Sequence, residues 1–138
     1  MATFNKFDSF VEALAEGKHN LETDTLKVVL TNSAPAAANT QLSDITQIAN
    51  GNGYTTGGAT ATQTSSAQSS GTYKLVCSDV VWTASGSLGP FRYAVLYDDT
   101  STGDLLIGYW DYGSGLTLAS SDTFTVDFDG TNGVLQLV

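Results

Sequence analysis

The side chains that most often carry catalysis are scarce in this sequence. His19 is the one histidine and Cys77 the one cysteine among 138 residues. A Ser-His-Asp triad would have to use His19, but that residue follows the predicted end of a helix, where a surface cation complements the helix dipole. Cys77 alternates with Tyr73 and Leu75, which is typical of a small buried residue in a strand. One cysteine also excludes an internal disulfide, and one histidine excludes a histidine-rich metal site.

The acidic residues suggest two further chemistries, a calcium loop and a glycosidase pair. Asp127-Phe-Asp-Gly-Thr-Asn132 matches the opening of a calcium loop, but the later glutamate of an EF-hand is missing. Asp and Gly are also the residues that a hairpin turn requires, so we interpret this segment, and the acidic stretch from Asp98 to Asp104, as turns. Nothing in the order of the aspartates marks one as a buried acid opposite another. We therefore expect no enzyme, no cofactor and no metal.

The segment Tyr109-Trp-Asp-Tyr112 is the most suggestive of a binding function. In a strand, Tyr109 points away from Trp110 and Tyr112, so one set packs inside and the other reaches the surface. Exposed aromatic rings can stack on sugars or anchor a protein interface. The sequence leaves both the core role and the surface role open.

A single amphipathic helix is predicted within residues 1–20. Apolar residues recur there at spacings of three and four, with Thr3 as a possible cap and Gly17 at the end. The apolar face consists of Phe4, Phe7, Phe10, Val11 and Leu14. This face packs either on the β core of the same chain or on a neighbouring protein.

Residues 21–138 change to the period of two that β-strands require. About eight short strands are predicted, over 26–31, 72–77, 80–83, 90–97, 105–112, 116–118, 124–128 and 134–138. Gly113-Ser-Gly115 is expected to break one strand, and Asp129 to Gly133 to close a hairpin between the last two. The Thr-rich segment 54–72 favours a strand pair with a mobile tip over a flexible linker. We predict one domain, a mostly β, two-sheet antiparallel β-sandwich of jelly-roll type with one N-terminal helix.

The charge balance excludes two classes of partner. The formal net charge is −9, from 14 acidic and 5 basic residues. Nucleic-acid binding needs clustered Lys and Arg, and the five here are scattered. The negative field disfavours anionic membranes, and no apolar run approaches the roughly 20 residues that cross a bilayer. Since no signal peptide is visible, synthesis in the cytoplasm is expected.

Five blocks of the sequence resemble those of small phage virion proteins of similar length. The blocks are Phe4-Asn-Lys-Phe-Asp-Ser-Phe10, Leu26-Lys-Val-Val-Leu30, Ile48-Ala-Asn-Gly-Asn-Gly-Tyr54, Gly89-Pro-Phe-Arg-Tyr93 and Phe124-Thr-Val-Asp-Phe-Asp-Gly-Thr-Asn-Gly133. The resemblance runs over nearly the whole length and carries no catalytic signature. It implies a virion component, which we group with the capsid decoration (cement) proteins, and no functional residue is carried over from it.

We therefore expect a structural phage virion protein that binds the outside of the major capsid lattice and stabilises it. It would be made in the host cytoplasm and reside at the capsid surface as a symmetric dimer or trimer. The candidate interface residues are Phe4, Phe7, Phe10, Val11, Tyr109, Trp110 and Tyr112. A tail or head-fibre component is the alternative, and a carbohydrate-binding β-sandwich module is a third hypothesis.

Overall fold

The computed structural model describes residues 2–138, so the part of the predicted segment 1–20 that falls on Met1 lies outside the described residues. Within residues 2–138 the protein is mostly β, with one α-helix near the N-terminus and three antiparallel sheets. The fold class is therefore confirmed in its coarse form. The number of sheets is a correction, because the sequence predicted two.

The largest sheet contains five strands in the order β1-β8-β7-β2-β3. Its centre is the long hairpin of β7 (Leu88–Asp98) and β8 (Leu105–Leu118). Strand β2 (Leu26–Thr31) pairs with β7 along its whole length. The edge strands of this sheet are only two residues long: β1 (Asn5–Lys6) at one edge and β3 (Ala59–Thr60) at the other. Most of the outer edge of β8 therefore has no strand beside it.

The two smaller sheets contain the remaining five strands of residues 2–138. One has the order β10-β5-β4, from β10 (Leu135–Leu137), β5 (Thr72–Cys77) and β4 (Gln63–Ser69). The other pairs β6 (Val80–Thr83) with β9 (Thr123–Val126). The Thr-rich segment thus forms strands, as predicted, and its turn at Ser70-Gly71 has positive φ at both residues, which suits a two-residue hairpin turn.

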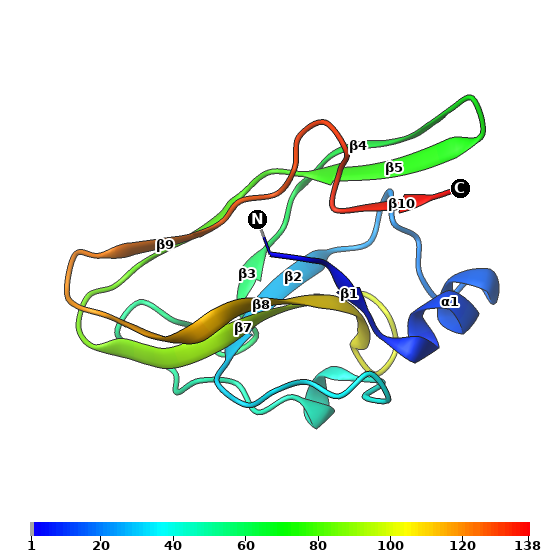
Figure 1. Cartoon of the computed structure of the whole chain (residues 1–138). Coiled ribbons are helices and arrows are strands. Elements are labelled where there is room, and N and C mark those ends of the chain that lie inside the picture. The colour runs from blue at the N-terminus through cyan, green and yellow to red at the C-terminus, as the bar shows by residue number, and fades with distance from the viewer. Residues whose placement is uncertain (1) are drawn as a thin grey trace.

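The main hydrophobic core lies between the five-stranded sheet and the smaller sheets. It includes Leu30, Leu96 and Ile107 from the former and Leu75, Trp82 and Leu135 from the latter. Figure 1 shows β4, β5 and β9 above β2, β7 and β8. Because neighbouring strand residues face opposite sides, the other face of the large sheet buries a second cluster, made of Phe7, Val29, Ile45, Val95, Tyr97 and Leu106.

The N-terminal segment differs from the predicted helix. The helix α1 spans only Asp8–Ala15, and its N-cap is Phe7, not Thr3. Residues before it form β1, whose Asn5 lies opposite Tyr109, and the Phe7 N–H donates to the Ile107 carbonyl at 3.2 Å. The free edge of β8 offers backbone groups that a helix starting at residue 4 would leave unpaired. Helical spacing of the phenylalanines was therefore misleading.

Other predictions of local structure were also wrong. Strand β8 does not end at Gly113 but continues to Leu118, which pairs with Leu88; the glycines only interrupt its pairing, because residues 112–115 have no partner on β7. Strand β10 pairs with β5 through Leu135 and Leu75, not with β9, so the turn before it is not a simple hairpin. A 3-10 turn, η1 (Leu42–Asp44), follows Gln41 as its N-cap in the connection between β2 and β3. Each error concerns a long-range pairing that local spacing does not encode.

Candidate functional site

A cavity of about 550 Å³ opens beside the free stretch of β8. Its volume falls within the range of about 300–1,000 Å³ that is common for ligand sites. Aromatic rings dominate its walls, and we call it the aromatic trough. Its principal rings are those of Phe4, Trp110, Tyr112, Phe124 and Phe128.

Strand alternation along β8 decides which aromatic residues face the trough. Trp110 and Tyr112 lie two residues apart and both line it. Tyr109 faces the other way, where its ring lies 5.3 Å from that of Phe7 in the second cluster. The predicted alternation is confirmed. Trp110 is half-buried against the main core, while Tyr112 is 56% exposed.

The rings of the trough contact one another in two groups. The Trp110 ring centroid lies 5.3 Å from that of Phe4 and 5.5 Å from that of Phe128. Phe124 lies 5.8 Å from Tyr112, with the rings edge to face. These separations fall in the favourable range for aromatic pairs, about 4.5–7 Å. The neighbours hold the rings in place, so the trough is formed before anything binds.

Phe4 reaches the trough because residue 108 is glycine. Strand β1 pairs Lys6 with Gly108, which brings the preceding Phe4 ring over the β8 backbone. A Cβ atom at position 108 would collide with that ring. The glycine therefore allows the close approach of an aromatic ring to a strand.

The opposite wall is the connection from β9 to β10. The Asp79 carboxylate accepts the Phe128 N–H at 3.0 Å, which fixes that residue. One oxygen of Asp129 accepts the N–H groups of Thr131 and Asn132, each at 2.8 Å. The hydrogen bonds from Asn132 and Thr131 hold the pKa of Asp129 below its usual range. Asp129 thus serves turn geometry, as the sequence predicted for this segment.

Two carboxylates and one guanidinium complete the lining. Asp127 is exposed and Asp129 half-buried at the rim. Arg92 also lines the trough, but its Nε and Nη2 donate to the two Asp111 oxygens at 2.8 and 3.0 Å. These hydrogen bonds hold the pKa of the Asp111 carboxyl below its ordinary value. The charge of Arg92 is therefore compensated within the chain.

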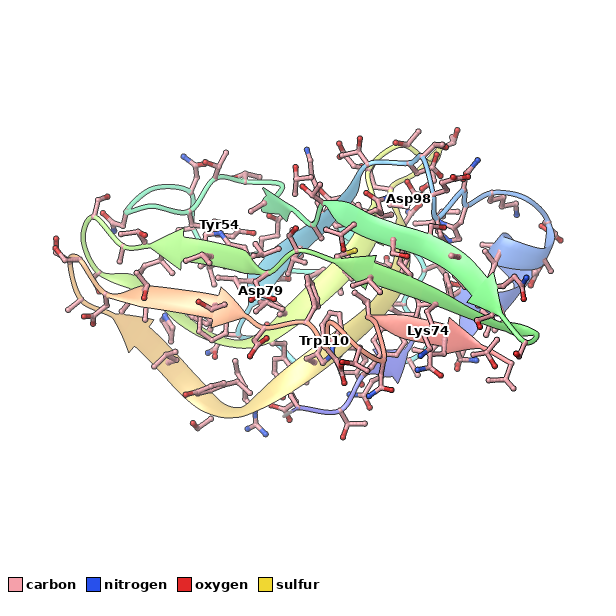
Figure 2. All side chains as sticks on the ribbon, turned by 90° about the horizontal axis from the view of Figure 1, so that it is seen from above. Tyr54, Lys74, Asp79, Asp98 and Trp110 are labelled. Atoms are coloured by element: carbon pink, nitrogen blue, oxygen red, sulfur yellow. The ribbon has the colours of Figure 1, made fainter. Side chains whose placement is uncertain are left out.

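His19 is not the surface residue that the sequence predicted. Its Nδ1 lies 2.8 Å from an Asp98 oxygen, and both side chains are 0% exposed. The ring also packs against Phe10, at 5.4 Å between centroids. Beyond Gly17 the chain turns inward, so His19 meets Asp98 at the end of β7. Figure 2 shows Asp98 well apart from Trp110, so this pair is not part of the trough.

The other oxygen of Asp98 accepts the N–H groups of Thr100 and Ser101 at 3.0 and 3.1 Å. Burial raises the pKa of Asp98, but its hydrogen bonds with His19, with the neighbouring Asp24 carboxyl and with these N–H groups outweigh burial and hold it below its ordinary value. In the part of the chain that is described, His19 Nε2 is buried without a hydrogen-bond partner. The pair is a buried structural contact, and Asp98 belongs to it as well as to the acidic turn that the sequence predicted.

The candidate contact residues lie in three places. Phe7 and Phe10 are buried in the chain's own clusters, which is one of the two roles that the sequence left open for this face. Val11 is 47% exposed on α1. Phe4, Trp110 and Tyr112 come together in the trough with Phe124 and Phe128, two residues that the sequence did not single out as contact candidates. The β9 to β10 connection adds a wall that periodicity did not reveal.

Within residues 2–138, no three His, Cys, Asp or Glu side chains gather into a group that could hold a metal ion. No helix in the same range is long and apolar enough to cross a membrane. Comparisons with protein-family models, with curated proteins and with solved structures found no match. Function is therefore inferred from the trough and from the resemblance of the sequence blocks.

Proposed function

We propose that the protein is a structural component of a phage virion, a capsid decoration protein that binds the outside of the major capsid lattice and stabilises it. The resemblance of the five sequence blocks supports the class. The open aromatic trough is the single observation that supports a mode of contact. The expected setting is the capsid surface, reached after synthesis in the host cytoplasm, with a dimer or trimer as the attached unit.

The trough has the features of a contact site that works without catalysis. Trp and Tyr are the residue types that most often dominate binding energy at protein interfaces. Tyr112 exposes a large ring on a strand that pairs with β7 on either side of it, through Asp111 and Leu116. Little ordering is needed when a partner covers such a ring, so more of the contact energy appears as affinity. Each copy can still bind weakly, because an oligomer engages several lattice sites at once.

The finer fold class is part of this proposal. We take the five-stranded sheet as one layer and the two smaller sheets as the other, since one core lies between them. This arrangement is a β-sandwich. Sheets of five, three and two strands do not reproduce the eight strands of a jelly roll, so we propose the sandwich without jelly-roll order.

Attachment to undecorated capsid shells tests the proposed function. Wild-type protein should sediment with the shells at a fixed ratio, and Tyr112→Ala should weaken attachment about tenfold or more, as expected for an interface hot spot. Val81→Ala is the matched control, because Val81 is 55% exposed but does not line the trough. Failure of the wild type to attach would reject the proposal.

Three outcomes would select another contact or another function. Loss of attachment in Val11→Ala but not in Tyr112→Ala would make the helix surface the contact. Copy number separates decoration from a tail or head-fibre part: hundreds per particle against tens or fewer. The aromatic rings also suit sugars, so glycan binding that Trp110→Ala abolishes would favour the carbohydrate-binding module.

A further inference from the structure

The charges around the aromatic trough indicate what kind of group it binds. We propose that the trough takes a positively charged Lys or Arg side chain presented by a polypeptide segment of the partner. The inference deepens the proposed function and rests on it, because the polypeptide nature of the partner comes from that proposal. The charge preference comes from the trough itself.

The rings provide the first requirement for a cation site. A cation is attracted to the face of Trp, Tyr or Phe when it lies within about 6 Å of the ring centroid. Trp110 and Tyr112 stand on the same side of β8, and Phe128 packs beside Trp110. A side chain that enters the trough therefore meets several rings at once.

The rim provides the second requirement, negative charge. Asp127 is exposed and forms no hydrogen bond or ion pair with any other residue in the range 2–138. Asp129 is held by the turn amides, so its carboxylate is fixed in place. A neutral or apolar ligand that covered these carboxylates would remove their hydration without replacing it. A cation would compensate them.

The chain's own cations do not fully compensate the rim. Arg92 is held by both oxygens of Asp111, and its guanidinium carbon lies 5.4 Å from the Tyr93 ring centroid. Lys74 donates to the Thr131 carbonyl at 3.3 Å, and its charge helps to lower the pKa of Asp129, but it does not line the trough. The net charge of −9 adds a long-range field that attracts basic segments. Rings, rim and overall charge thus favour the same class of ligand.

NMR titration of the full-length, ¹⁵N-labelled protein tests the charge preference. The probes are acetylated, amidated peptides Ala-Ala-X-Ala-Ala in which X is Arg, Lys, citrulline or Leu. The Arg and Lys peptides should shift the indole N–H signal of Trp110 in a saturable way. The citrulline and Leu peptides should bind about threefold more weakly or worse, the loss expected for an exposed cation–π contact. The buried Trp82 indole serves as an internal control.

A pair of charge variants separates the local site from the overall field. Asp127→Asn should weaken binding of the Arg peptide by a similar factor. Asp8→Asn removes the same charge from an exposed position at the start of α1 and should leave binding unchanged. Equal effects of the two variants would overturn the proposal.

Other results would also reject the cation site. Equal shifts by the Arg, citrulline and Leu peptides would do so, as would a Trp110 shift with maltose but not with the Arg peptide. Shell attachment that needs Tyr112 without any peptide preference would leave the proposed function intact. A clear preference for the Arg peptide without attachment to shells would reject the proposed function but support the cation site.

Discussion

Two aspartates of the β7–β8 hairpin each contact a basic side chain, but one contact is buried and the other is partly exposed. Asp98, at the end of β7, meets His19 with both side chains 0% exposed. Asp111, on β8, meets Arg92 with side chains 37% and 39% exposed. The first pair lies in a closed end of the molecule and the second beside the open aromatic trough. One hairpin therefore has a sealed end that supports the fold and an open end that is free to bind.

The difference follows from what covers each end. The segment after α1 folds His19 onto Asp98, and Phe10 packs on the histidine ring. At the open end, β1 covers only Gly108 and Tyr109 of β8. Trp110 and Tyr112 lie just beyond the last paired residue. The short length of β1 thus leaves the trough exposed.

The largest expected effect is on stability at the sealed end. Asp98→Ala removes one member of a buried pair and should lower the free energy of unfolding by about 3–5 kcal/mol. Asp111→Ala, the matched change at the open end, should cost no more than about 1 kcal/mol. Chemical denaturation of both variants measures this contrast. Equal losses would mean that the two ends do not differ as described.

A smaller effect is expected from filling the space beneath Phe4. Gly108→Ala should cost about 1–3 kcal/mol, typical of overpacking, and should change the near-ultraviolet circular dichroism as the Phe4 ring leaves Trp110. Gly130→Ala is the control, because a Cβ there meets no atom within 4 Å. If both variants behave like the wild type, Phe4 is not held over β8.

The pH dependence of stability distinguishes the sealed pair from the rest of the chain. The pKa of Asp98 is lowered from its ordinary value of 3.8, so the unfolded chain takes up its proton first as the pH falls. The stability from this carboxylate is full above its unfolded pKa and is lost as the pH falls through the lower folded pKa. The stability difference between wild type and Asp98→Asn should therefore shrink as the pH falls below about 4. A constant difference down to pH 2 would contradict this.

The smallest expected effect concerns chemical labelling of Cys77, which should be very slow in the native protein. Burial raises the pKa of the Cys77 thiol to about 11, so little thiolate exists at pH 8 and the sulfur is covered. A thiol reagent should label the native protein very slowly and the denatured protein quickly. Fast labelling of the native protein would show that the main core opens readily.

The sequence revealed what depends on local spacing. The strands from Leu26 and Thr72, the turn chemistry of Asp129 and the opposite directions of Tyr109 and Trp110 all follow from alternation and turn residues. Phe7 and Phe10 take the core role that the sequence left open, but Phe7 lies before the helix because pairing of β1 with β8 replaced the first turn of the predicted helix. His19 was misjudged because its partner lies 79 residues away. The second wall of the trough, at Phe128, likewise depends on long-range pairing of β10 with β5.

The most direct test of the central claim is hydroxyl-radical footprinting of the protein free and attached to shells. If the aromatic trough is the contact, oxidation of Trp110 and Tyr112 should fall sharply on attachment, while oxidation of Val81 should stay unchanged. Unchanged oxidation of Trp110 and Tyr112 on fully decorated shells would show that another surface makes the contact.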